Sequence, residues 1–319
     1  MEYLQVIAGL VLLVYSGKYL VNGGVSLAKS FHVSTLVVGI TVVAFGTSAP
    51  ELIVSLNAAI SGHSEIAIGN VVGSNIANIG FILALTAIII PISVNRLSLI
   101  SDWPIMMFAG LLLYAFLYNN VISVLEGIIL LVFLVLFVLW TIRLSKKNPE
   151  VFKEEKEIEA PQYRIPIAIG IVIAASAGLA LGADFLVNGS TKIALNFGIS
   201  ERIISITVVA VGTSIPELTA SIIAAFKKQP DISLGNVVGS NIFNIFGVIG
   251  ISATISPINI SHDIFNFDII VMLLISIVLF LFIFPFKTVY LRRYEGISLL
   301  LIYIGYIYLV ISGNSEKIL

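Results

Sequence analysis

Apolar stretches about as long as a membrane span recur along the whole chain, and they constrain the fold more than any other feature. Only 11% of the 319 residues are Asp, Glu, Lys or Arg, and the mean hydropathy is +1.08. A soluble domain carries about 25% charged residues, so a water-facing surface cannot be built from this chain. We therefore predict an all-α membrane protein with ten transmembrane helices of about 20 residues each. The predicted spans are 3–26, 34–60, 66–91, 103–118, 121–142, 165–188, 200–225, 232–256, 267–286 and 295–312.

The balance of charge and the lack of cysteine exclude several classes of protein. The 17 basic and 18 acidic residues nearly cancel, which leaves no basic surface for nucleic acid. Without cysteine the chain has no disulfide, no thiolate metal site and no cysteine nucleophile. We expect membrane lipid around the protein, no cofactor and no required protein partner.

Lys and Arg are unevenly divided between the loops that ten spans create. Thirteen of the 17 fall in one set of alternating loops and three in the other, while Lys18 lies inside the first span. Positive residues stay on the cytoplasmic side, so we expect a cell-membrane protein with both termini outside. The one long polar segment, 145–164, is then a cytoplasmic linker between a first half, 1–144, and a second half, 165–319.

The two halves repeat each other at a constant offset of 166 residues. Residues 40–56 read ITVVAFGTSAPELIVSL, and residues 206–222 read ITVVAVGTSIPELTASI. Residues 68–79 read IGNVVGSNIANI, and residues 234–245 read LGNVVGSNIFNI. Because each half holds five spans, an odd number, the second half is expected to enter the membrane from the opposite side. Such inverted-topology repeats are typical of secondary transporters, whose ion site lies near the midplane between the repeats.

The first duplicated block places a glutamate beside a predicted helix break. Proline lacks a backbone N–H and clashes with the carbonyl four residues earlier, so Pro50 is expected to break its helix and free backbone carbonyls. Such backbone is tolerated within a membrane only where it is buried in protein or lines a cavity. The spacing lets Thr47, Ser48 and Glu51 face one way. The second copy of this set is Thr213, Ser214, Pro216 and Glu217.

Carbonyl, hydroxyl and carboxylate oxygens together form a ligand set for a hard cation. Calcium takes six to eight such oxygens in flexible geometry. No histidine or cysteine lies near the blocks, which argues against zinc and copper. An ionised carboxylate in mid-membrane costs about 2.5–3.5 kcal/mol, so two at equivalent positions indicate a function.

The second duplicated block adds a stripe of uncharged polar residues. Asn70, Ser74 and Asn78 follow i, i+4, i+8 spacing, and we expect the last two to contact ions. Asn75 falls off the stripe and is expected to form hydrogen bonds between helices. The second copy is Asn236, Ser240 and Asn244, with Asn241 off the stripe.

The charge of the predicted site suggests a mechanism. Two carboxylates balance one Ca²⁺ or two Na⁺, and a third Na⁺ leaves one positive charge over. The same ligands can bind either Ca²⁺ or Na⁺ but not both at once, because the cations repel each other. Competition for one site, combined with alternating access, gives antiport.

The two pairs of blocks resemble the paired α-repeats of the sodium/calcium exchanger family, in the calcium/cation antiporter superfamily. The resemblance rests on GTSAPE with GNVVGSNIAN in the first half and GTSIPE with GNVVGSNIFN in the second. It implies ten helices in two inverted halves, and electrogenic exchange of three Na⁺ for one Ca²⁺. It also implies that the first and sixth helices slide against a rigid core.

The resemblance further implies roles for particular residues. Some relatives have Asp where this chain has Asn244, and that acid is associated with potassium-dependent exchange, so potassium co-transport is not expected. The long cytoplasmic calcium-sensing domains of animal relatives have no counterpart in residues 145–164. The implied Ca²⁺ ligands are Glu51, Glu217 and the carbonyls of Thr47 and Thr213, and the implied Na⁺ ligands are Ala44, Ser48, Ser74, Asn78, Ala210, Ser214, Ser240 and Asn244.

Other functions remain open from the residues alone. One alternative is antiport of Ca²⁺ with protons or of another divalent cation, although the GNxxE-type repeat of proton/calcium exchangers does not occur in this chain. A cation channel usually relies on symmetric subunits or rings of carbonyls, which fits a duplicated break within one chain less well. An enzyme is not expected, because Ser48 has no histidine or lysine in register to act as a base.

Overall fold

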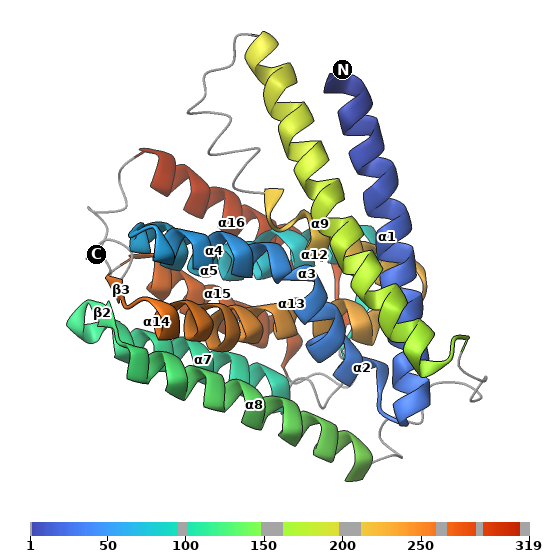
Figure 1. The fold of residues 1–319 in the computed structure, drawn as a ribbon, viewed down its shortest axis with the longest axis horizontal. Helices are drawn as coiled ribbons and strands as arrows, with labels where there is room; N and C mark the ends of the chain where they lie inside the picture. The colour runs from blue at the N-terminus through green and yellow to red at the C-terminus, as the bar shows by residue number, and fades with distance from the viewer. Residues whose placement is uncertain are drawn as a thin grey trace.

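The structure is a computed structural model that describes residues 2–94, 101–147, 162–197, 212–259, 267–284 and 290–312. The described chain is almost entirely helical (Figure 1). Its first half contains α1 (Glu2–Phe31), α2 (Thr35–Val38), η1 (Gly39–Val43), α3 (Ala44–Thr47), α4 (Ala49–Ile60), α5 (Ser64–Ala77), η2 (Asn78–Leu83), α6 (Ala84–Ile89), β1 (Ile92–Ser93), α7 (Trp103–Phe116), η4 (Leu117–Asn119), β2 (Val121–Ile122) and α8 (Val124–Lys147). Its second half contains α9 (Ile165–Asn196), α12 (Ile215–Phe226), α13 (Pro230–Phe243), η6 (Asn244–Ile249), α14 (Gly250–Ile255), β3 (Ile258–Asn259), α15 (Ile269–Ile283), β4 (Tyr290–Leu291) and α16 (Arg293–Ser312).

Each predicted span overlaps a helical segment. Within the described residues, six helices are long and apolar enough to cross a membrane, namely α1, α5 with α6, α8, α9, α13 with α14, and α16. The segment from α2 to α4 is a further candidate that bends by 49° at its break, and α7, α12 and α15 are shorter apolar helices. Residues 198–211, which include most of the first half of the span predicted at 200–225, lie outside the described residues. A helical membrane protein is therefore confirmed, whereas the ten crossings and the inverted relation of the halves stay predictions.

Two of the long helices form the centre of the molecule. In the most apolar 18 residues of α5 with α6 and of α13 with α14, 72% and 83% of the residues are buried. The corresponding share in the other four long helices is 17–33%. Both central helices carry the second duplicated block, so the polar stripe is packed inside the protein rather than against lipid.

Both central helices also change their winding at the stripe. Residues 78–83 and 244–249 are π-helical, and these turns begin at Asn78 and Asn244. A π-helical turn holds an extra residue and is frequently found at functional sites. The sequence pattern did not predict these turns.

Two short strand pairs connect the first half to the second. β1 pairs antiparallel with β4, with Ile92 opposite Leu291. β2 pairs antiparallel with β3, with Ile122 opposite Ile258. All four of these residues are buried, so each pair closes an end of the helical core.

α1 and α9 lie side by side and cross the other helices at a steep angle (Figure 1). Small residues allow this close packing. A Cβ atom added at Gly9 would lie 2.8 Å from the carbonyl oxygen of Gly182, so neither helix could carry a larger side chain there without moving. The first helix of each half thus packs mainly against its counterpart.

Helix α8 extends into the first residues of the predicted linker. α8 continues through residue 145 to Lys147. Ser145 is buried, and its hydroxyl accepts a hydrogen bond of 3.0 Å from the backbone N–H of Ser34. Residues 148–161 of the predicted linker lie outside the described residues.

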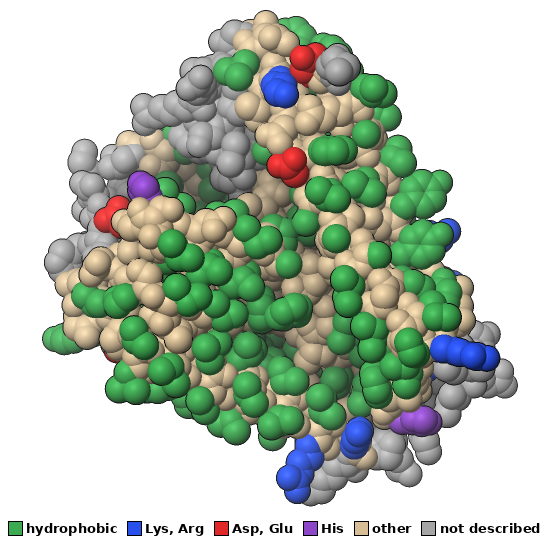
Figure 2. Space-filling view, viewed as in Figure 1, with side chains coloured by type: hydrophobic (Ala, Val, Ile, Leu, Met, Phe, Trp, Pro, Cys, Tyr) green, Lys and Arg blue, Asp and Glu red, His purple; other side chains and the backbone are tan. Residues whose placement is uncertain are grey.

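The surface is apolar over most of the face in Figure 2, where charged side chains are few and lie in its upper part and along its lower and side edges. Lys and Arg gather at the lower edge, where α8 ends and α9 begins in Figure 1. Exposed apolar side chains on α1, α8 and α16 include Leu10, Leu136 and Ile304. Such a surface suits hydrocarbon and not water.

Candidate cation-binding site

Two breaks in the helices position the two glutamates. Between α3 and α4, Ser48 leaves the helical conformation with φ −84° and ψ 9°. Ser214, directly before α12, does the same with φ −89° and ψ 3°. Each following helix has proline in its first turn, where the missing N–H is tolerated. Glu51 and Glu217 therefore lie in the first turn of α4 and α12, where the helix dipole favours a carboxylate.

Both carboxylates are buried inside the protein. Glu51 and Glu217 are each 1% exposed, and they are close enough to interact electrostatically. Two buried carboxylates without compensating charge are strongly unfavourable. A cation bound beside the pair would supply the missing positive charge.

Hydroxyl groups join one glutamate to the opposite half of the chain. The Ser48 hydroxyl donates a hydrogen bond of 2.8 Å to Oε1 of Glu217. The Ser240 hydroxyl lies within hydrogen-bond distance of Ser48, with 3.0 Å between the two Oγ atoms. Thr47 donates to Oδ1 of Asn236 at 3.0 Å. Residues at the helix break of the first half thus contact the polar stripe of the second half, Asn236, Ser240 and Asn244, through its first two members.

Five buried side-chain oxygens of the predicted site residues have no hydrogen-bond partner in the described part of the chain. Buried polar atoms of native proteins are nearly always satisfied, so a group of unsatisfied oxygens needs a ligand. All five are acceptors that a hard cation can use. They are Oε2 of Glu51, Oε2 of Glu217, Oδ1 of Asn78, Oδ1 of Asn244 and Oγ of Ser214.

A symmetric set of amides fixes the orientation of Asn78 and Asn244. Asn78 donates through Nδ2 to Oδ1 of Asn241 at 2.9 Å, and Asn244 donates through Nδ2 to Oδ1 of Asn75 at 3.0 Å. Asn75 and Asn241 each donate to the backbone carbonyl of the other at 3.2 Å. The predicted interhelical role of Asn75 and Asn241 is confirmed. Because both Nδ2 groups of Asn78 and Asn244 are engaged, their Oδ1 atoms are left for a cation.

Two methionines complete this set of amides, and the sequence pattern did not single them out. Met272 Sδ lies 3.7 Å from Nδ2 of Asn75, and Met106 Sδ lies 3.6 Å from Nδ2 of Asn241. Residues 106 and 272 are related by the same offset of 166. The offset of 166, applied outside the two duplicated blocks, would have identified this pair of methionines.

The first asparagine of each stripe, Asn70 or Asn236, forms hydrogen bonds with the helix that follows the break. Nδ2 of Asn70 donates to the carbonyl of Glu51 at 3.3 Å and to Ser55 Oγ at 2.9 Å. Asn236 makes the same two contacts, to the carbonyl of Glu217 at 3.2 Å and to Ser221 at 3.0 Å. These bonds hold the first turns of α4 and α12 in place. Neither serine was predicted.

The structure brings most of the predicted ligands into the buried interior. Thr213 is partly exposed, unlike its counterpart Thr47. Ala210 lies outside the described residues. The buried predicted ligands are Ala44, Thr47, Ser48, Glu51, Ser74, Asn78, Ser214, Glu217, Ser240 and Asn244.

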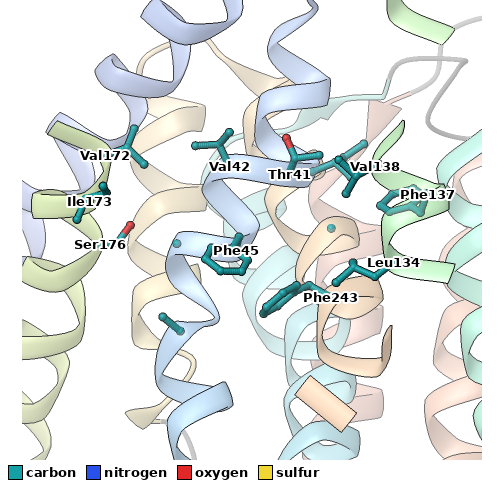
Figure 3. A pocket seen from close by; sticks show the side chains of 14 residues that line it. Thr41, Val42, Phe45, Leu134, Phe137, Val138, Val172, Ile173, Ser176 and Phe243 are labelled. Atoms are coloured by element: carbon teal, nitrogen blue, oxygen red, sulfur yellow. The ribbon is translucent and has the colours of Figure 1, made fainter. Parts of the chain in front are cut away.

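An apolar cavity of about 470 Å³ adjoins the first break (Figure 3). Phe45 and Phe243 face it from η1–α3 and α13, while Leu134 and Ile173 face it from α8 and α9. Thr41 is one of its few polar residues, and its hydroxyl already donates to the carbonyl of Val37 at 2.6 Å. This lining offers few ligands to a cation, so the cavity is not the ion site.

The ligand set within the described residues is made of oxygen atoms. No group of three or more His, Cys, Asp and Glu side chains is found there. The two carboxylates are supplemented by neutral amide and hydroxyl oxygens instead. This composition suits Na⁺ and Ca²⁺ better than transition metals.

Comparison with known families decides the assignment. The family model described as "Sodium/calcium exchanger protein" matches residues 1–143 and 167–312. The chain belongs to the sodium/calcium exchanger family. Residues 144–166, between the two matched parts, include the linker predicted from composition. The resemblance inferred from the duplicated blocks is thereby confirmed.

Relatives of this exchanger-family chain match it over nearly their full length. A protein named "Putative antiporter CaxA" of Alkalimonas amylolytica is 37% identical over 316 residues, covering 97% of this chain and 98% of that protein. "Sodium/calcium exchanger MaX1" of Methanosarcina acetivorans is 32% identical over 342 residues, covering 96% and 97%. These relatives are named as transporters and not as enzymes.

A solved structure of the sodium-calcium exchanger NCX_Mj has the same fold as this member of the family. For a crystal of NCX_Mj soaked with zero Na⁺ and Ca²⁺, the TM-score is 0.82 at 31% identity. The match covers 97% of this chain and 98% of that one. The fold similarity therefore extends over both halves and not only over the duplicated blocks.

Proposed function

We propose that this chain is a secondary active antiporter that exchanges Na⁺ for Ca²⁺ across the cell membrane by alternating access. The observation that carries the proposal is the group of five unsatisfied buried oxygens on Glu51, Glu217, Asn78, Asn244 and Ser214. They come from both halves of the chain, and two belong to carboxylates. No protein donor in the described chain competes with a cation for them.

The proposed roles follow from the type of oxygen that each residue offers. Ca²⁺, with the higher charge, is held by the carboxylates of Glu51 and Glu217 and by the carbonyls of Thr47 and Thr213. Na⁺ is held by the hydroxyl, amide and carbonyl oxygens around them. The proposed Na⁺ ligands are Ala44, Ser48, Ser74, Asn78, Ala210, Ser214, Ser240 and Asn244.

The proposed stoichiometry is three Na⁺ for one Ca²⁺. Two carboxylates neutralise a bound Ca²⁺, whereas three Na⁺ leave one positive charge on the occupied site. Each cycle then moves one net charge, so transport responds to voltage. The family and the two carboxylates support this ratio.

The proposed architecture is ten transmembrane helices in two inverted repeats of five, 1–144 and 165–319, joined by the cytoplasmic linker 145–164. Both termini are placed outside. The distribution of Lys and Arg supports the orientation, and the separate packing of α1 with α9 supports a sliding pair that opens the site to each side in turn.

The direct test is Ca²⁺ uptake into proteoliposomes that contain the purified protein. Vesicles loaded with Na⁺ are diluted into Na⁺-free buffer with labelled Ca²⁺, and a parallel sample has a pH gradient and no Na⁺ gradient. We expect uptake only with the Na⁺ gradient. Uptake that follows the pH gradient and ignores Na⁺ would instead indicate proton coupling and refute the proposal.

The stoichiometry is tested in the same vesicles with K⁺ and valinomycin to set the membrane potential. When three Na⁺ leave for each Ca²⁺ that enters, net positive charge moves out, so an inside-positive potential speeds uptake. A rate that is independent of the potential would exclude the three-to-one ratio. For variants of Glu51 and Glu217, the matched control is Glu65→Gln, because Glu65 is an exposed glutamate in the first turn of α5.

A further inference from the structure

A second cavity, of about 520 Å³, lies away from the cation site. It is enclosed by the C-terminal half of α1, the residue Gln162 ahead of α9, and the turn between α12 and α13. Its lining residues are Val21, Asn22, Val25, Ser26, Lys29, Gln162, Lys227 and Gln229.

This cavity has the opposite electrostatic character to the cation site. Lys29 and Lys227 are both partly buried in its wall, and none of the described residues that line it is acidic. Burial and the nearby charge of Lys18 lower the pKa of Lys227, because both disfavour the positive charge of its ammonium group. An anion in the cavity would compensate it.

The other polar groups of the wall are mainly able to donate hydrogen bonds. The ammonium group of Lys227 donates to Oδ1 of Asn22, which leaves the Nδ2 group of Asn22 as a donor. Ser26 is 1% exposed, and its hydroxyl has no hydrogen-bond partner among the described residues. Gln162 and Gln229 add two further amides. Such a group of donors fits a ligand with several acceptor oxygens.

We propose that this cavity is a binding site for a phosphate-class anion, held by Lys29 and Lys227 and oriented by Asn22 and Ser26. Lysine is a common phosphate ligand that acts as a point charge. The cavity is far larger than one phosphate ion, and Val21 and Val25 give it an apolar side, so a phosphate ester with an organic substituent fits as well.

The site joins α1 to the end of the helix that carries Glu217. Lys227 directly follows α12, whereas Lys29 lies in the last turn of α1. A bound anion therefore bridges two elements that otherwise meet here through the contact between Lys227 and Asn22. Binding is expected to stabilise the folded protein, because a ligand that binds only the native state adds to its stability.

Two sources could supply such an anion, a phospholipid headgroup or free phosphate. The full-length protein is reconstituted into nanodiscs of phosphatidylcholine alone or with phosphatidylglycerol, and native mass spectrometry counts the retained lipids. In the phosphatidylcholine discs, the melting temperature is measured against inorganic phosphate at constant ionic strength. Phosphatidylglycerol retention identifies a headgroup, and a phosphate-dependent rise in melting temperature identifies the free ion.

The double variant Lys29→Gln/Lys227→Gln tests the site itself, with Lys228→Gln as the matched control. Lys228 is the next residue, but it is exposed and does not line the cavity. We expect the double variant to weaken binding of the anion by about tenfold or more, since each charge-assisted hydrogen bond contributes strongly. The control should bind as the unmodified protein does.

The proposal is overturned if neither probe binds to the unmodified protein, or if the double variant binds as well as the control. If the double variant does not fold, Lys29→Arg/Lys227→Arg keeps both charges and should retain binding, while the single glutamine variants should each weaken it. Equal binding in all of these variants would likewise reject the site.

Discussion

The two halves of the cation site carry equivalent residues but hold them differently. In one half, Ser48 donates to Glu217 and lies beside Ser240. In the other, the equivalent hydroxyl of Ser214 has no hydrogen-bond partner in the described part of the chain, whereas each glutamate keeps one such unsatisfied oxygen. The residue types are the same, so the difference between the serines comes from conformation. One serine is hydrogen-bonded across the two halves, and the equivalent serine is available to a ligand.

Backbone packing is close at a glycine of the second half. A Cβ atom at Gly239, on α13, would lie 2.4 Å from the carbonyl oxygen of Ile40, so α13 is in close contact with η1. The offset of 166 relates Gly239 to Gly73 on α5, and it relates Ile40 to residue 206, which lies outside the described residues.

Removing either carboxylate should have the largest effect, and it should be equal in the two halves. Glu51→Gln and Glu217→Gln each keep the shape of the side chain but remove the charge that a divalent cation needs. We expect each to lower Ca²⁺ transport by at least about 100-fold, because an uncompensated buried charge costs about 3–5 kcal/mol. Uptake by proteoliposomes measures this. Flux at the unmodified level in either variant would remove the site from the mechanism.

The glycine that contacts η1 should matter for folding. Gly239→Ala forces the backbone of η1 away, so we expect it to destabilise the protein by about 1–3 kcal/mol. Thermal unfolding measures this. An unchanged melting temperature would contradict the close contact between α13 and η1.

The sequence predicted the elements of this comparison but not the difference between them. The proline that follows each Thr-Ser pair predicted both helix breaks, because proline disrupts a helix wherever it lies in the interior. The offset of 166 paired Glu51 with Glu217, because an internal repeat can be read directly from the sequence. The different hydrogen bonding of Ser48 and Ser214 could not be predicted, because identical residue types do not indicate which serine forms the bond. The supporting contacts of Ser55 and Ser221 also depend on which helices meet, and that is set by tertiary packing.

Substitution of Ser48 and of Ser214 by alanine should change different properties of the protein. Ser48→Ala removes the hydroxyl that satisfies Glu217, so we expect the ion-free protein to lose about 1–3 kcal/mol of stability. Ser214→Ala removes a hydroxyl that has no partner in the described chain, so stability should hold while the apparent affinity for Na⁺ falls. Unfolding without ions and Na⁺ titrations of transport distinguish the two. Equal losses of stability would mean that the halves are held alike.

The methionines should give the smallest effect, and it should again be equal in the two halves. Met106→Leu and Met272→Leu keep the volume but remove the sulfur beside the amides of Asn241 and Asn75. We expect each to raise the Na⁺ concentration for half-maximal transport by about twofold, because contacts to sulfur are weak. Na⁺ titration of Ca²⁺ uptake measures this. A tenfold change in one variant alone would show that one half depends on its amides far more than the other.

The central claim is that one buried site, built from both halves, holds either Ca²⁺ or Na⁺. Equilibrium binding of labelled Ca²⁺ to the purified, full-length protein tests it most directly, with and without Na⁺ and with Glu65→Gln as the control. We predict one Ca²⁺ per chain, displaced by Na⁺, lost in Glu51→Gln and in Glu217→Gln, and retained in the control. Ca²⁺ binding that persists in either glutamine variant, or that Na⁺ does not displace, would contradict the account.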